Sequence, residues 1–228
     1  MVSVLAEELI KKASSIVSFI QKKGYPSQET LAYAYDRIFQ LPLKQIQKIY
    51  ADMDFLESII ESPERHRQTD PEITKDVLAL LKMKVDGRFW DNMKDNDIVE
   101  IYCSNGIQVY RSFNMFKTTG YSLWDLNLYS WDELWERSSL SVHRIHSVVN
   151  DILNEKFEVF DFDHQEETVK EILNSKLTEP FMPRSLRVKL GQIAACRDIV
   201  TNEIRGFAVT TQCKIISIGK DSEQISFI

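Results

Sequence analysis

The sequence predicts an α+β protein in which an all-helical N-terminal region precedes a five-stranded antiparallel sheet with short helices. Apolar residues recur at helical spacing through about residue 85, and their period changes from about 3.6 to 2 at Asp97. The pair Asn105-Gly106 then separates two β-rich runs, which is the strongest short-range signal of a hairpin. We therefore expect a helical region at residues 1–88 and a sheet domain at residues 89–228.

Four helices are expected in the N-terminal region. The first covers residues 3–23, where the apolar positions form one stripe that needs a partner, and Gly24 supplies a left-handed cap. Ser27 can cap the second helix, which carries apolar residues at helical spacing up to Phe39. Dimerisation is the expected use of the first helix.

The third and fourth helices are expected on either side of a polar loop. Pro42 suits the first turn of the third helix, which runs to about Ile60. The polar run 64–69 predicts the loop. Asp70 can cap the fourth helix, which ends at an Asp86-Gly87 stop.

The sheet domain is expected to begin with the hairpin at Asn105-Gly106, in which a type I′ turn requires positive φ at both central residues. Short helices separate this hairpin from three later strands. In chain order the later elements are short helices through Gly120-Tyr121-Ser122 and at 131–137, a helix at 140–153, a strand at 157–163, an acid-rich helix at 166–177, and strands at 188–199 and 204–218.

Composition excludes several classes of function. The net charge is −6, from 28 basic and 34 acidic residues, so no basic field draws the chain to a phosphate backbone and nucleic acid is not expected as a partner. Charged residues interrupt the apolar stretch 2–20, so no membrane span is expected. Three cysteines without paired spacing, and no secretion signal, predict reduced thiols in a cytoplasmic protein. A bacterial source is a separate expectation.

Catalytic motifs are missing from the sequence. It has no Gly-x-Ser-x-Gly elbow and no phosphate-cradling glycine loop, and it contains only seven glycines. An enzyme that used an inner cavity would need a perturbed polar group, for which Cys103 and His146 are the first candidates. We therefore expect no enzymatic activity.

Two segments resemble the Per-Arnt-Sim (PAS) family of sensory and protein-interaction domains. In the first, the triplet Gly120-Tyr121-Ser122 is followed by Asp125 and Leu126, which is similar to the first helices of the family. In the second, residues 197–207 are similar to a hairpin with a polar turn, an apolar residue, a charge, a glycine and a β-former. Together with the order of the elements, the resemblance covers roughly residues 90–218.

The sequence departs from the family pattern at three places. Ser112 stands where the family usually has an asparagine after its second strand, and residues 164–179 are an insertion between the third and fourth strands. No Asn-Cys-Arg-Phe-Leu run occurs, so the flavin-adduct photochemistry of light-sensing members is not supported.

The resemblance implies a ligand site between the inner face of the sheet and the short helices. The residues expected to face this space are Ile101, Trp124, Leu128, His146, Val149, Phe160, Phe207 and Val209. The same residues would also suit a filled core, because apolar and aromatic stripes are most often simply buried. The identity of a cofactor is not predicted by the sequence.

Histidines and acids offer two weak candidates for a metal or haem site. His143 and His146 lie three apart on one predicted helix, and some PAS sensors hold haem through a helix histidine, which would be His146 here. A surface histidine is the expected alternative, because no third ligand is in view. The acidic residues at 161–167 could hold calcium or magnesium, but such a run is more often a solvated strand end followed by the acidic first turn of a helix. No metal site is therefore expected.

We therefore expect a non-catalytic signalling protein whose PAS-like domain senses a small ligand or docks a protein partner. Its N-terminal helices would serve dimerisation or output, so a homodimer and a protein signalling partner are expected. The alternative is a transcription regulator that binds DNA through the helix pair at 29–40 and 43–53. The second of these helices carries only Lys44 and Lys48 early on, whereas DNA readers have a denser basic face.

Overall fold

The computed structural model describes residues 2–25, 41–128, 131–163, 166–172 and 184–218. Its helices are α1 (Val2–Lys22), α3 (Leu43–Ile60), the 3-10 helix η1 (Pro63–Arg67), α4 (Asp70–Leu80), α5 (Arg88–Asp91), α6 (Met115–Thr118), α7 (Leu123–Leu128), α8 (Trp131–Leu134) and α9 (Ser139–Leu153). Its strands are β1 (Met83–Lys84), β2 (Ile98–Cys103), β3 (Gln108–Arg111), β4 (Trp135–Glu136), β5 (Val159–Asp161), β6 (Glu166–Glu171), β7 (Arg184–Asp198) and β8 (Ile204–Ile218).

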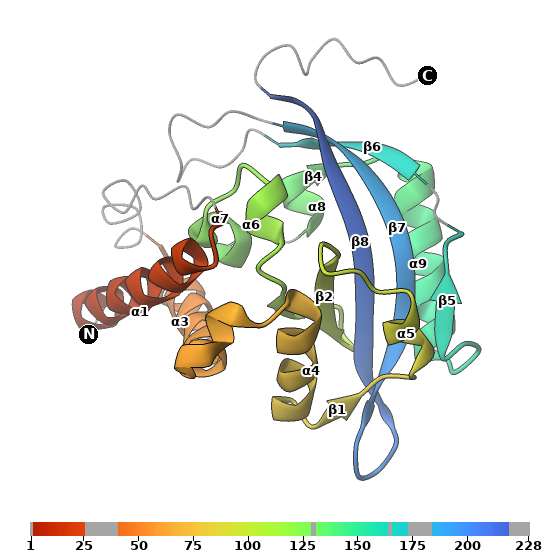
Figure 1. The fold of residues 1–228 in the computed structure, drawn as a ribbon, viewed down its shortest axis with the longest axis horizontal. Helices are drawn as coiled ribbons and strands as arrows, with labels where there is room; N and C mark the ends of the chain where they lie inside the picture. Colours follow the sequence, from red (N-terminus) through yellow and green to blue (C-terminus); the bar gives the residue numbers. More distant parts are fainter. Residues whose placement is uncertain (1, 26–40, 129–130, 164–165, 173–183, 219–228) are drawn as a thin grey trace.

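These strands form one curled antiparallel sheet, with α1 and α3 on one side of the molecule and α9 on the other (Figure 1). The sheet order is β3-β2-β8-β7-β6-β4, and β1 and β5 also pair with β7. The α+β class is therefore confirmed, but the prediction of five strands is wrong because the described residues contain eight. The strand β7 is 15 residues long, so one of its edges pairs in turn with β6, β5 and β1.

The strand β6 lies where an acid-rich helix was expected at 166–177. Side chains alternate along it, and Val169 and Glu171 are buried on one face. Pairing with β7 thus overrides the helical propensity of the glutamates. Residues 173–183 lie outside the described part of the chain, so the rest of that prediction is not addressed.

The predicted hairpin is present as β2 and β3, but its turn is not type I′. Gly106 has a positive φ of 78°, whereas Asn105 is not among the described residues with positive φ. The N–H of Gly106 donates to the Cys103 carbonyl at 2.9 Å, and the Asn105 Oδ1 accepts from the N–H of Ile107 at 3.2 Å. This is the geometry of a three-residue loop closed by a left-handed glycine.

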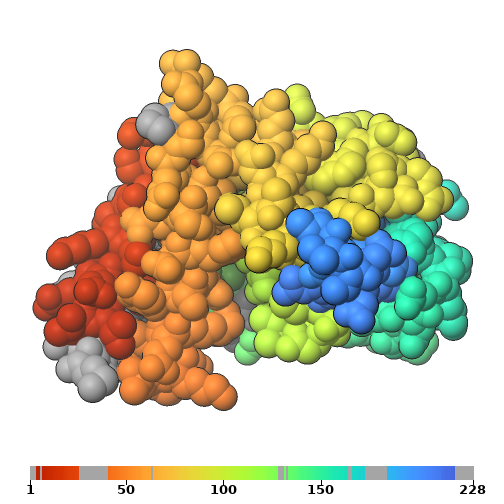
Figure 2. Space-filling view, turned by 90° about the horizontal axis from the view of Figure 1, so that it is seen from below, coloured from red at the N-terminus to blue at the C-terminus, as the bar shows by residue number. Residues whose placement is uncertain are grey.

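The helical region differs from expectation at its end. Thr69, and not Asp70, caps α4 through a capping box with Glu72, and η1 replaces the predicted loop. The helix ends at Leu80, because the following pair Met83–Lys84 joins the sheet as β1. Figure 2 shows this part of the chain (yellow) against the β7–β8 hairpin (blue). The second predicted helix lies outside the described residues.

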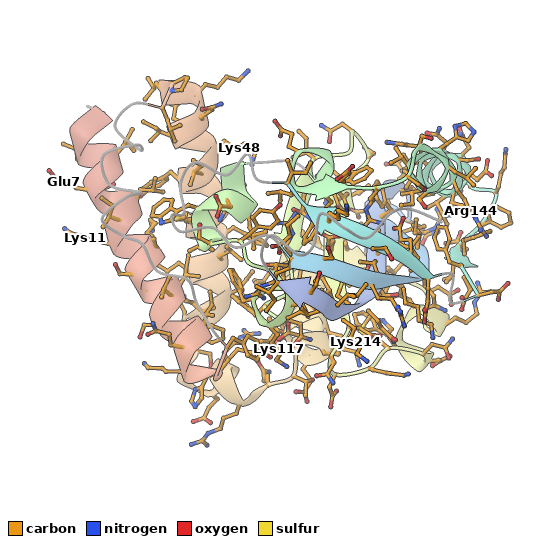
Figure 3. All side chains as sticks on the ribbon, turned by 90° about the horizontal axis from the view of Figure 1, so that it is seen from above. Glu7, Lys11, Lys48, Lys117, Arg144 and Lys214 are labelled. Atoms are coloured by element: carbon orange, nitrogen blue, oxygen red, sulfur yellow. The ribbon has the colours of Figure 1, made fainter. Side chains whose placement is uncertain are left out.

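The apolar stripe of α1 is covered within this chain. Leu9, Ala13, Ile16 and Ile20 are fully buried, and α1 lies alongside α3 (Figures 1 and 3). The charged residues Glu7 and Lys11 lie on the opposite, outer side of α1. The stripe that needed a partner therefore finds it in α3, and one continuous apolar core runs from α1 and α3 into the sheet.

The pairing of β2 with β8 joins the first hairpin to the last one. All six residues of β2, Ile98 to Cys103, pair with residues 206–211. Gly206 allows this approach, because a Cβ at this position would lie 1.9 Å from the Tyr102 carbonyl oxygen. One pair along, the Tyr102 and Phe207 rings stack with their centroids 4.9 Å apart.

Replacing Gly206 by alanine is expected to lower the free energy of unfolding by about 2–3 kcal/mol, because the strands must separate to admit the methyl group. Urea unfolding measures this change. The matched control is Gly87→Ala, since a Cβ there meets no atom within 4 Å. Equal stabilities of the two variants would contradict the close approach of β2 and β8.

Candidate functional site

A cavity of about 340 Å³ lies between α9 and the inner face of the sheet. Its floor is formed by β2, β7 and β8, and its rim by Trp131, Trp135 and residues of α9. Most of the lining side chains are apolar, with a few polar groups among them. This size and composition are typical of sites that hold small molecules.

Side chains alternate between the two faces of a strand, so every second residue in the central part of β8 faces the cavity. Alternate residues of β8, from Phe207 through Val209 and Thr211 to Cys213, line the cavity. On β7 the lining residues Leu190 and Ile193 are three apart, because the register with β8 shifts between them.

The helix α9 closes the cavity from above. Ile145, Val149 and Leu153 follow one another at intervals of four, so they lie on one face and line the cavity. Ser138 caps the helix, since its Oγ accepts a hydrogen bond from the N–H of Ser141 at 3.1 Å. The neighbouring positions Val148 and Ile152 are buried against the sheet.

Two ion pairs form the polar part of the wall. The Arg137 Nη1 pairs with the Glu167 Oε1, and these side chains are only 12% and 10% exposed. The Arg111 Nε lies 3.0 Å from the Glu100 Oε1, with side chains 8% and 15% exposed. Glu100 and Arg137 line the cavity directly, whereas Arg111 and Glu167 hold them from behind. Each charge on the wall is therefore matched by an opposite one.

Three uncharged side chains lie near these pairs: Gln108, Tyr102 and Cys213. The Gln108 Nε2 donates to the Glu100 Oε1 at 2.7 Å and lies 3.0 Å from the Tyr102 Oη. Burial raises the pKa of Tyr102 well above its ordinary value, and burial raises the pKa of the Cys213 thiol to about 12. Both groups are therefore uncharged at neutral pH.

Trp131 links the charged wall to α9. The Arg137 guanidinium lies 5.8 Å from the centre of the Trp131 ring, and the exposed His146 ring lies 5.8 Å from it. The tryptophan therefore contacts both the ion pair and the rim.

The structure brings together four of the eight predicted site residues. His146, Val149, Phe207 and Val209 line the cavity. Ile101 and Trp124 are buried in the main apolar core instead, and Phe160 packs against the Phe157 and Phe162 rings. Ile101 differs because neighbouring residues of a strand point to opposite faces, so that Tyr102 is the one that faces the cavity.

The side chain of Leu128, at the end of α7, lies outside the described part of the structure. Sequence reasoning missed the lining residues Glu100, Arg137 and Cys213. The alternation of β8 from Phe207 could have found Cys213. Nothing local could have found the Arg137 pair, because its partner lies on a strand that the sequence predicted as a helix.

A second cavity of about 300 Å³ lies between α3, α7 and β3. Arg111 lines it and pairs with Glu100 of the main cavity, and Tyr102, Gly106 and Trp131 line both cavities. Lys48 lies on the side of α3 that faces α7 (Figure 3), and its Nζ donates to the Asn127 carbonyl at 3.2 Å. The helical region therefore reaches the wall of the main cavity from behind.

A buried carboxyl group fixes β6 to the loop before α7. The Glu171 Oε1 accepts from the N–H of Gly120 at 2.6 Å, and its Oε2 accepts from the N–H of Arg184 at 2.9 Å. Burial raises the pKa of this carboxyl group to about 7 despite these hydrogen bonds.

No family model matches the sequence, and no curated protein is found to match it. Along the described helices, none is long and apolar enough to cross a membrane. Among the residues that the structure describes, no three His, Cys, Asp or Glu side chains gather closely enough to hold a metal ion.

The raised pKa of Glu171 predicts how stability depends on pH. The folded protein holds this proton more tightly than the unfolded chain, so the contribution is present at low pH and is lost as pH rises toward 7. Relative to Glu171→Gln, the wild-type protein should lose up to about 1.4 kcal/mol per pH unit between about pH 5 and 7.

Urea unfolding of both proteins across this pH range measures the difference. The control is Glu166→Gln, which removes an exposed carboxyl group from the same strand. A stability difference between wild type and Glu171→Gln that does not change with pH would show that the folded-state pKa is ordinary.

Proposed function

We propose that the protein is a non-catalytic sensor that binds a small molecule between α9 and the inner face of the sheet. The observation that carries this proposal is the cavity of about 340 Å³, with apolar walls and a few polar groups. A filled core would bring Val149, Val188 and Val209 together without leaving such a space. A site for one small ligand is therefore the function that the geometry supports best.

A PAS-like identity for the sheet domain is part of this proposal. The hairpin β2–β3 pairs with the later hairpin β7–β8, and α6 to α9 lie between them along the chain. Ser122 and Asp125 form a capping box at α7, in the segment that carries the resemblance. These observations support the proposal, as does the curl of the sheet around the helices (Figure 1).

Binding would act as a signal only if the ligand favours one packing of the molecule over another. The strand β2 is the element that could transmit such a preference. Its residue Glu100 lines the cavity. The carbonyl of Asp97, the residue before the strand begins, accepts a hydrogen bond from the Asn114 Nδ2 at 2.9 Å. The backbone N–H of Asn114 donates to Asp70 of the helical region. This connection supports the proposal that output passes through that region to a protein partner.

Homodimerisation stays a prediction, and it would need a surface other than the stripe of α1 that α3 covers. The DNA-binding alternative gains no support from α3. Three residues of this helix, Ile46, Ile49 and Met53, are buried, and Lys48 is paired with Asp52 at 2.7 Å. A lysine held in this way is less free to contact a phosphate.

Filling the cavity should abolish ligand binding. We expect protein purified from cells to carry a small molecule that native mass spectrometry detects and that denaturation releases. Val209→Trp should lack this mass, because the indole would occupy the space above β8. The control Ile216→Trp, on the exposed side of the same strand, should retain it.

Circular dichroism would establish that both variants fold. Two results would contradict the proposal. One is a wild-type protein that carries no bound small molecule, even after incubation with a small-molecule extract of the cells that produced it. The other is a bound mass that Val209→Trp retains.

A further inference from the structure

The charge of the ligand follows from the charges on the cavity wall, an inference that rests on the proposed function. Five titratable side chains line the cavity: Glu100, Tyr102, Arg137, His146 and Cys213. Tyr102 and Cys213 are neutral for the reasons given above. His146 is exposed at the rim, where water screens its charge. The interior charges are therefore those of Glu100 and Arg137.

Both of these charges are already balanced. Arg137 pairs with Glu167, and Glu100 pairs with Arg111, so each charge on the wall has an opposite charge directly behind it. All four side chains are at least 85% buried. An ionised ligand would add a single uncompensated charge to this poorly solvated space, which is costly. A neutral ligand avoids that cost.

Three buried polar atoms of the two ion pairs have no hydrogen-bond partner within the described residues: Arg137 Nε, Glu167 Oε2 and Arg111 Nη2. An unmet buried donor or acceptor costs free energy, and a ligand in the cavity would not recover it, because these atoms have almost no accessible surface. The Arg137 guanidinium is held in place by Glu167 and lies against the Trp131 ring.

The remaining walls are aromatic and aliphatic. Trp131, Trp135, Tyr102 and Phe207 line the cavity together with valines and leucines. Such walls favour a flat aromatic body through stacking and edge contacts. We propose that the cavity takes an uncharged aromatic molecule.

Three probes with one aromatic body separate charge from shape: 1-naphthylacetamide, 1-naphthylacetate and 2-(1-naphthyl)ethylamine. Their affinities can be measured by ligand-observed NMR titration. Wild-type protein should bind the neutral amide at least about tenfold more tightly than either ion. Competition by the amide for the molecule that co-purifies would place both in the same cavity.

Two variants should reverse this preference in opposite directions. Glu167→Gln leaves Arg137 unpaired, so naphthylacetate should become the tightest probe. Arg137→Gln leaves Glu167 unpaired, so the naphthylethylamine should gain instead. Circular dichroism would confirm that the variants fold. If one of them does not fold, the change of charge preference can still be measured with the other.

The outcomes distinguish this inference from the proposed function. Binding of a charged probe to wild-type protein as tightly as the amide would overturn the ligand class while leaving the cavity as a binding site. Unchanged preferences in both variants would also overturn it. Failure of all three probes to bind wild type and both variants would count against the cavity as a site at all.

Discussion

The pairing of β2 with β8 is the constraint on which the rest of the structure depends. It joins the two hairpins into one sheet, and it is possible only because Gly206 lets the backbones approach more closely than any side chain would permit. The register that results sets Glu100 opposite Val209 and stacks Tyr102 on Phe207. The polar wall and the apolar floor of the cavity therefore both follow from one backbone contact.

A second, buried polar junction attaches the helical region to this sheet. The Lys23 Nζ lies 3.5 Å from the Asp70 Oδ1, and these side chains are 4% and 0% exposed. Asn114 receives a hydrogen bond from Tyr25 and donates to Asp70, so three segments far apart in sequence meet here. Burial raises the pKa of Asp70, as expected where desolvation outweighs pairing. The net stabilisation from such a pair is small, because the desolvation of both charges offsets their attraction.

Local signals in the sequence predicted local structure, and contacts between distant segments decided the rest. The Asn105-Gly106 pair predicted the first hairpin, whereas the position of Val209 at the cavity was implied only by the resemblance to PAS domains. The two-residue strand Met83–Lys84 carries no periodicity, so only its pairing with β7 reveals it. Glu167 has a helical propensity that the edge of β7 overrides, and the site residue Arg137 was missed with it.

The most direct measurement of the central claim compares two thiols in one protein. Burial raises the pKa of both Cys196 and Cys213, so both thiols are protonated at neutral pH, but of these two only Cys213 lines the cavity. In refolded, ligand-free Cys103→Ser protein, methyl methanethiosulfonate should modify Cys213 faster than Cys196, and 1-naphthylacetamide should slow only Cys213. Equal rates, set by global unfolding, would contradict the claim that small molecules can enter the space between α9 and the sheet.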